Sequence, residues 1–109
     1  KKGKISIDRK IDFHGLSVID AEKLFYSTIE SCFKKKQRCI LFITGKGIMK
    51  KRTNSEDNLK LYYGKIRNSF FLWSKKPQLQ KYILNIQEAG LKYGADGAFF
   101  VYLRKKSNL

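Results

Sequence analysis

The first third of the chain alternates apolar and polar residues with two different periods. Residues 9–14 alternate at every second position until Gly15 interrupts them, which predicts a strand that ends at a tight turn. From Ser17, a residue favoured at helix N-caps, to about Lys35, apolar side chains recur at helical spacing. The buried face of this predicted helix holds Ala21, Leu24, Phe25, Thr28, Cys32 and Phe33.

A second strand is predicted over residues 38–44. Its centre, from Ile40 to Ile43, is continuously apolar, as is usual for a strand that is buried on both faces. Two strands joined by a helix form a parallel βαβ unit. The carboxyl ends of both strands, near His14 and Gly45, should therefore lie at the same edge of the sheet.

The remainder of the chain predicts a loop, a helix and two closing strands. Residues 46–63 are polar and basic, which is typical of a long loop, and long loops in compact domains are often functional. A helix is predicted over residues 65–74, with Trp73 in the core because its spacing from Ile66 and Phe70 is helical. Strands are predicted at residues 81–87 and 98–104, separated by a loop with Gly90, Gly94 and Gly97.

A chain of 109 residues has room for one compact domain. Hydrophobic residues make up 42% and aromatic residues 14% of the sequence, which suits a folded core. We expect this core to span about residues 5–105. Residues 1–4 and 106–109 are expected to be flexible, and the loop at residues 48–63 is expected to be mobile.

The charge balance points to a polyanionic partner. Twenty-four Lys and Arg against nine Asp and Glu give a formal net charge of +15 and a sequence pI near 10.0. DNA, RNA and an acidic membrane surface are the candidates, and a charge that only keeps the protein in solution is the alternative. The longest apolar runs, residues 40–43 and 98–103, are too short for a membrane span. With no signal-peptide pattern, we expect a cytoplasmic monomer without a small-molecule cofactor.

The two cysteines are expected to be reduced core residues. Cys32 and Cys39 stand at the end of the predicted helix and the start of the predicted strand, and they form no C-x-x-C pair. Because His14 is the only histidine, a zinc site of the usual His and Cys type is excluded.

Asp12 and His14 are the first candidates for chemistry. They lie two residues apart on one predicted strand, so their side chains should point to the same face at its carboxyl end. A carboxylate beside an imidazole can orient the ring and raise its basicity, which suits acid or base catalysis on a phosphodiester. The alternative is a histidine that serves only as a structural hydrogen-bonding group next to a turn.

The tetrapeptide Thr44, Gly45, Lys46 and Gly47 follows the second predicted strand directly. Its glycines let the backbone approach a ligand, exposed N–H groups can form an anion-binding nest, and Lys46 adds positive charge. It is no Walker A loop, because the upstream glycine and the hydroxyl residue after the lysine are missing. A simple turn with a solvated lysine is the alternative.

Four motifs in this order resemble the Smr (small MutS-related) domain family over about residues 5–105. They are Ile-Asp-Phe-His-Gly at 11–15, Thr-Gly-Lys-Gly at 44–47, Gly-Lys-Ile-Arg at 64–67 with Trp73 following, and Gly-Ala-Asp-Gly-Ala at 94–98. The resemblance implies an α/β fold of the α+β two-layer type. Its mixed four-stranded sheet and two helices follow in the order βαβαββ, as in the C-terminal domain of bacterial translation initiation factor three.

The resemblance also implies nucleic-acid binding and, in several members, DNA-nicking or RNA endonuclease activity. The acidic and histidine motif falls on Asp12 and His14, and the glycine-rich motif falls on Thr44 to Gly47. The closing loop falls on Gly94 and Gly97. Two departures concern catalysis more than binding: Tyr93 stands where many relatives have histidine, and Asp96 stands where a small or neutral residue is common. Tyr93 could donate a hydrogen bond or stack on a base.

Two hypotheses follow, both with DNA or RNA as the partner. In the first, an endonuclease, His14 moves the proton while Lys46 and Arg67 stabilise charge on the phosphate. In the second, a non-catalytic binding module, the same edge and the basic loop at Lys50, Lys51 and Arg52 hold backbone phosphates. A ribosome binder rests on fold analogy alone. Asp12 and Asp96 do not establish a metal site, so dependence on Mg²⁺ or Mn²⁺ stays open.

Overall fold

The computed structural model describes residues 6–45, 66–90 and 95–106, with the side chains at 95 and 96 excepted. The mobile loop expected at residues 48–63 lies outside these ranges, and so do residues 1–4 and 107–109. Lys106, at the start of the expected flexible end, is described, and its Nζ donates to the carbonyl oxygen of Lys34 at 3.3 Å.

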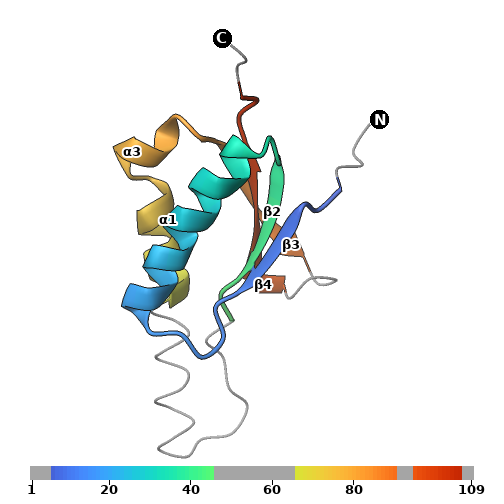
Figure 1. Cartoon of the computed structure of the whole chain (residues 1–109). Coiled ribbons are helices and arrows are strands. Elements are labelled where there is room, and N and C mark those ends of the chain that lie inside the picture. The colour runs from blue at the N-terminus through green and yellow to red at the C-terminus, as the bar shows by residue number, and fades with distance from the viewer. Residues whose placement is uncertain (1–5, 46–65, 91–94, 107–109) are drawn as a thin grey trace, which may run out of the picture.

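The described strands form one mixed sheet of four strands. They are β1 (Arg9–Asp12), β2 (Cys39–Ile43), β3 (Ile83–Gly90) and β4 (Ala95–Leu103), in the spatial order β1-β2-β4-β3. The β1–β2 pair is parallel, and β4 pairs antiparallel with both β2 and β3. Figure 1 shows the helices together on one face of this sheet. The predicted two-layer α+β fold is therefore confirmed.

Helix α1 (Val18–Lys34) begins and ends close to its predicted bounds. The Ser17 hydroxyl caps its amino end by accepting a hydrogen bond from the backbone N–H of Asp20 at 3.1 Å. At the other end, Lys36 adopts a positive φ of 64°, a conformation that ends a helix and that L-residues rarely adopt. The helix buries Ala21, Phe25, Thr28 and Cys32 as its spacing predicts, and Ile29 in addition. Leu24 and Phe33, also predicted on this face, are half-buried.

Residues 66–74 are helical, as predicted, and a short helix that the sequence pattern did not indicate follows them. This helix, α3 (Pro77–Gln80), has Pro77 in its first turn. Proline suits that position because its missing N–H would have no partner within the helix. Pro77 therefore starts one helix as well as following another, and Leu79 of α3 is buried in the core.

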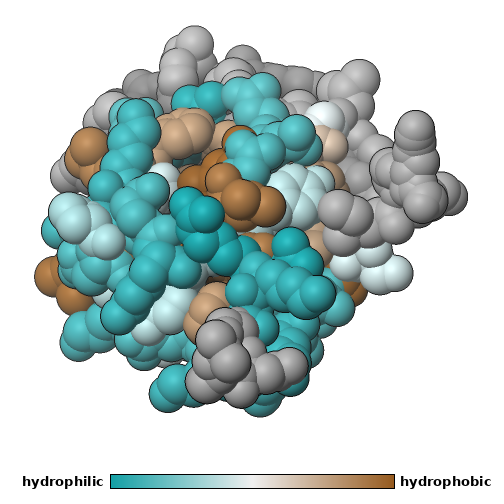
Figure 2. Space-filling model, turned by 90° about the horizontal axis from the view of Figure 1, so that it is seen from above, coloured by the Kyte–Doolittle hydropathy of each residue, from teal (hydrophilic) through white to brown (hydrophobic). Residues whose placement is uncertain are grey.

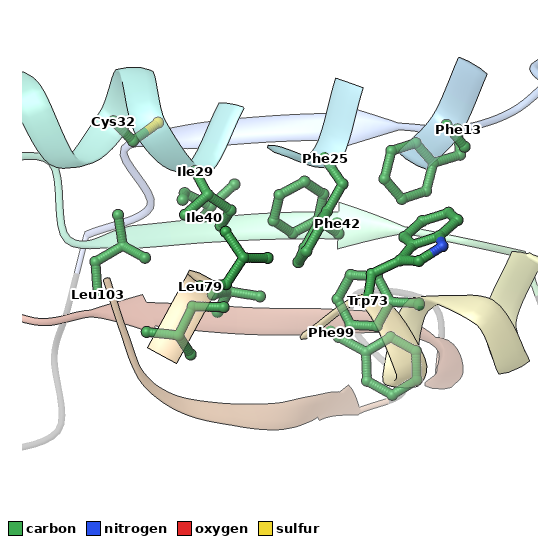
Figure 3. Close-up of a cluster of buried hydrophobic side chains, with 14 of the residues drawn as sticks. Phe13, Phe25, Ile29, Cys32, Ile40, Phe42, Trp73, Leu79, Phe99 and Leu103 are labelled. Carbon is green, nitrogen blue, oxygen red and sulfur yellow. The ribbon is translucent and has the colours of Figure 1, made fainter. Parts of the chain in front are cut away.

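Aromatic rings fill the core between the helices and the sheet (Figure 3). The Phe25 ring lies 5.0 Å from that of Phe42, 5.1 Å from that of Phe70 and 5.8 Å from that of Trp73, centroid to centroid. Trp73 is 4% exposed, which confirms that it is a core residue. Because each ring touches several others, truncating Phe42 to alanine should cost about 3–5 kcal/mol of stability.

Both cysteines are free and buried, as predicted. Burial raises the pKa of the Cys32 and Cys39 thiols, so both stay protonated and unreactive near neutral pH.

The closing strands differ most from their predicted bounds. The β3 strand runs on to Gly90, which has a positive φ of 85°, and β4 starts at Ala95. Gly90 pairs with Ala95, and Gly97 lies within β4, so both glycines belong to strands and not to the loop that was expected to contain them. The prediction failed because glycine weakens a strand pattern along the sequence, whereas pairing with a neighbouring strand can still hold it in the sheet.

Candidate functional site

The ends of β1 and β2 bring the two early motifs together. Asp12 pairs with Ile43 in the parallel register, and the backbone N–H of Phe13 donates to the carbonyl oxygen of Ile43 at 2.9 Å. His14 thus leaves β1 at the level where Thr44 leaves β2. In Figure 1 these strand ends lie beside the start of α1. The expected meeting of the two motifs at one edge is observed for their described residues.

The turn after β1 holds His14 at the surface. Asp12 and His14 are exposed, whereas Phe13 between them is fully buried and stacks on Phe42 at a centroid distance of 5.6 Å. Gly15 has a positive φ of 82°, and the backbone N–H of Leu16 donates to the carbonyl oxygen of Phe13 at 3.0 Å. Because the turn is fixed by Phe13, the position of the His14 backbone is fixed with it.

Asp12 has a role in this turn that the sequence did not indicate. Its Oδ1 accepts a hydrogen bond from the backbone N–H of His14 at 2.9 Å, which forms an Asx turn. The strand also ends at Asp12, so the two residues do not share a strand as predicted. The carboxylate thus acts on the main chain of His14, a contact that the sequence had not indicated.

Thr44 and Gly45 join β2 to β4 through a single acceptor. The carbonyl oxygen of Gly97 accepts the N–H of Thr44 at 2.8 Å and the N–H of Gly45 at 3.1 Å. The Thr44 hydroxyl lies 3.2 Å from the same oxygen and 3.0 Å from the carbonyl oxygen of Gly45, and Thr44 is 2% exposed. These two N–H groups are used within the fold and are not free to bind an anion, whereas Lys46 and Gly47, the other half of the expected nest, lie outside the described residues.

The amino end of α1 carries negative charge. Residues 12–22 contain the carboxylates of Asp12, Asp20 and Glu22 and no lysine or arginine. Asp20 stands in the first helical turn, where a carboxylate complements the helix dipole. The described part of the site therefore does not attract phosphate by charge.

Arg67 lies at the β3–β4 side of the sheet. Its guanidinium is 3.8 Å from the Glu88 carboxylate, and its Cζ lies 5.7 Å from the Phe71 ring centroid and 5.9 Å from that of Phe99. Its side chain is 26% exposed. These contacts fix the guanidinium and partly neutralise its charge. No sequence pattern indicates this pairing, because Glu88 lies on another element.

Several predicted site residues lie outside the described part of the chain: Lys46, Gly47, Lys50, Lys51, Arg52, Tyr93 and Gly94. Within the described part, no group of three or more His, Cys, Asp or Glu side chains is placed to hold a metal ion. No helix in those same ranges is long and apolar enough to cross a membrane.

Sequence reasoning missed two features of the site. The Gly97 carbonyl, the acceptor for Thr44 and Gly45, carries no side-chain signal, although the glycine itself belongs to the closing motif. Phe13 was part of the alternation that predicted the strand, but its role as the anchor of the turn was not expected.

Known structures share this arrangement of strands and helices. The chain resembles the Smr domain of Thermus thermophilus MutS2 with a TM-score of 0.66 and 19% identity, over 88% of this chain and 98% of that one. It resembles YdaL, a stand-alone small MutS-related protein from Escherichia coli, with a TM-score of 0.71 and 22% identity, over 94% and 70% of the respective chains. At these identities the likeness shows the fold. The chain matches no curated protein sequence.

The family model for the Smr domain matches residues 11–104 of this chain. The fold is thus that of a two-layer α+β domain, and the chain belongs to the Smr domain family. Smr domains are nucleic-acid-binding, nuclease-like domains, and some members of the family are associated with nuclease activity.

Proposed function

We propose that this domain is an endonuclease that cleaves the phosphodiester backbone of DNA or RNA, with His14 as its general acid or base. The parallel register of β1 and β2 carries the proposal, since it sets the exposed His14 beside the end of the neighbouring strand. Open α/β sheets bind ligands at such strand ends. An imidazole held there by the Asp12 turn is positioned to move a proton.

In the proposed reaction, His14 takes a proton from a water molecule while the oxygen of that water forms a bond to phosphorus. The bond from phosphorus to the leaving oxygen breaks, and that oxygen takes a proton from solvent. Lys46 would offset the charge on the phosphate in the transition state. Arg67, which lies at the β3–β4 side of the sheet, would add positive charge, and its contact with Glu88 lowers the charge that it can offer.

Phosphate contacts are proposed for the remaining residues of the two glycine-rich motifs and the basic loop: Gly47, Lys50, Lys51, Arg52, Tyr93 and Gly94. Thr44, Gly45 and Gly97 hold the frame of the site through their mutual hydrogen bonds.

A non-catalytic binding module is the second candidate, and one observation favours it. The N–H groups of Thr44 and Gly45, the described backbone donors nearest the end of β2, both point to Gly97. An oxyanion hole needs donors directed at the reacting phosphate. A module that only binds the nucleic-acid backbone stabilises no transition state and so needs no oxyanion hole.

Labelled supercoiled, single-stranded and branched DNA, and RNA, each incubated with the domain and Mg²⁺, Mn²⁺ or a chelator, test the proposal. We expect cleavage of at least one substrate by the wild type and its loss in His14→Ala. Cleavage in chelator would assign the chemistry to the protein's own side chains. Cleavage only with Mg²⁺ or Mn²⁺ would show that the reaction needs a divalent ion. If a folded wild type binds every substrate and cleaves none, the endonuclease proposal is wrong and the non-catalytic binding module is the function that remains.

A further inference from the structure

Positive charge collects at the end of the molecule opposite His14. The described ranges contain fourteen lysines and arginines, and ten of them fall in four segments: residues 34–38, 75–76, 81 and 104–106. We call these four segments the basic end. Residues 34–38 lie between the carboxyl end of α1 and the start of β2, and residues 75–76 follow the helix at residues 66–74. Residue 81 precedes β3, and residues 104–106 follow β4. Figure 2 looks onto this end, where hydrophilic teal surface predominates.

Hydrogen bonds hold the four segments in place relative to one another. The Nζ of Lys106 donates to the carbonyl oxygen of Lys34 at 3.3 Å, and the Nε of Arg38 donates to that of Leu103 at 2.8 Å. Arg104 reaches α3, because its Nε donates to the carbonyl oxygen of Gln80 at 3.0 Å. The basic end is therefore an ordered array and not a set of independent chain termini.

Gln80 and Tyr82 extend this network. The Nε2 of Gln80 donates to the carbonyl oxygen of Ser74 at 3.0 Å, next to Lys75 and Lys76. The Tyr82 ring lies 4.9 Å from that of Phe33 in α1, and the Nζ of Lys81 lies over the Tyr82 ring at 5.2 Å.

Helix capping explains only a small part of this charge. Lysines in the last turn of a helix complement the negative end of its dipole, which accounts for Lys34 and its neighbours. It does not account for the seven cationic residues beyond Lys36, which are Arg38 and the six in the other three segments. Asp8, the carboxylate of this region that contacts residues 38 and 39, accepts their backbone N–H groups with its Oδ2.

We infer that the basic end is a second contact surface for nucleic acid, one that binds the phosphates of a duplex while His14 stands at the opposite end. This inference rests on the proposed function, that the domain binds nucleic acid. The four segments contain no apolar side chain that could enter a bilayer, so a membrane surface fits them less well. The described part of the His14 site carries carboxylates, so cations other than those beside α1's amino end must supply the attraction to a polyanion, and the basic end holds most of the described ones.

The two ends are separated by the length of α1. Its 17 residues span about 25 Å at 1.5 Å per residue. Phosphates on one DNA strand follow at about 3.4 Å, so a duplex that reaches from one end to the other covers about seven base pairs. Contact at both ends would fix the direction in which the duplex passes His14.

Two double variants of the full chain test the inference. Lys35→Gln/Lys105→Gln removes two exposed cations of the basic end, and Lys10→Gln/Lys23→Gln removes two exposed cations from elsewhere. Both lower the net charge equally, so a difference between them reports position and not total charge. Affinity for a labelled DNA duplex longer than the span of α1 is measured over a range of salt concentrations. Melting of each variant is recorded first.

We expect the basic-end variant to bind about tenfold more weakly at low salt, with a salt slope reduced by about 0.9 for each phosphate that the variant no longer neutralises. The control variant should stay close to wild type, both in duplex affinity and in the rate of cleavage at saturating duplex. If Lys35→Gln disturbs the end of α1, Lys76→Gln/Lys105→Gln carries the same expectation.

Equal losses of affinity in the two double variants would overturn this inference and leave the proposed function standing. So would a basic-end variant that keeps duplex affinity but loses binding to phosphatidylserine vesicles, since that result would assign the basic end to a membrane. A wild type that binds no nucleic acid would overturn the proposed function and this inference together.

Discussion

The two ends of α1 differ in almost every respect that matters for a polyanion. At the amino end, Ser17 caps the helix, and His14 is exposed on the turn before it. The charged residues of this stretch are the carboxylates of Asp12, Asp20 and Glu22. At the carboxyl end stands the basic end, a network of lysines and arginines tied together by main-chain acceptors. If the basic end binds duplex phosphates, proton transfer and a large share of the electrostatic attraction are assigned to separate places in one small domain.

This separation has a physical advantage for an imidazole. A charge array one helix length away can raise the local concentration of substrate without altering the histidine. Variants at the two ends should therefore change different measured quantities.

The largest expected effect is on cleavage in His14→Ala. Loss of a general acid or base typically lowers the rate about a hundredfold or more, while affinity should stay within a few-fold because the binding charge lies elsewhere. Single-turnover cleavage and duplex affinity, measured on a variant with a wild-type melting transition, check both parts. A folded variant that cleaves at the wild-type rate would show that the activity comes from another protein in the preparation.

Asp12 should have a smaller effect that depends on the substitution. Asp12→Ala removes the acceptor for the His14 N–H and frees the turn, so we expect cleavage about tenfold slower. Asp12→Asn keeps an oxygen acceptor at the same position and should lose less. Rates of both variants, compared at saturating substrate, measure the difference. If Asn is as damaging as Ala, the carboxylate charge matters more than the turn.

Thr44→Val tests whether the end of β2 is a frame or a phosphate ligand. The variant removes the hydroxyl that lies within hydrogen-bonding distance of the carbonyl oxygens of Gly97 and Gly45. Gly97 still accepts two N–H groups, so stability should fall by only about 1 kcal/mol. Chemical denaturation measures this loss. Duplex affinity should be unchanged, and a clear drop in affinity without loss of stability would make Thr44 a ligand.

The thiols report on the rigidity of the basic end. Burial raises the pKa of Cys39, at the start of β2, and that of Cys32 in α1. Native protein should therefore react slowly with a thiol reagent, and unfolded protein should react quickly. Because the folded pKa lies above the unfolded value, the stabilising contribution is present below the unfolded pKa and is lost as pH rises through the folded pKa. Fast labelling near neutral pH would mean that this end opens locally.

Trp73 should show the smallest change. The indole is 4% exposed and packs edge-on against Phe13 at 6.1 Å, so its emission should be blue-shifted. Saturating duplex should not quench it, since neither end of α1 exposes the ring. Strong quenching with an unchanged fold would place nucleic acid against the helix at residues 66–74 and break the separation of the two ends.

The sequence alone determined the elements whose signal is local. The alternation around Phe13, the helical spacing from Ala21 and the apolar run of β2 each specify an element within a short stretch of chain, and all three are observed. The ordered motifs were sufficient to indicate the family. Cys32, Cys39 and Trp73 were placed correctly in the core because an apolar side chain at a periodic position has few other places to lie.

Only the tertiary structure decided the contacts between distant segments. The Gly97 carbonyl that accepts Thr44 and Gly45, the pairing of Arg67 with Glu88, and the Asp12 bond to the His14 main chain leave no periodic trace in the sequence. The basic end belongs to the same class, since its four segments are scattered along the chain and meet only when the sheet forms. Composition set the total charge of +15, and folding decided where much of it lies.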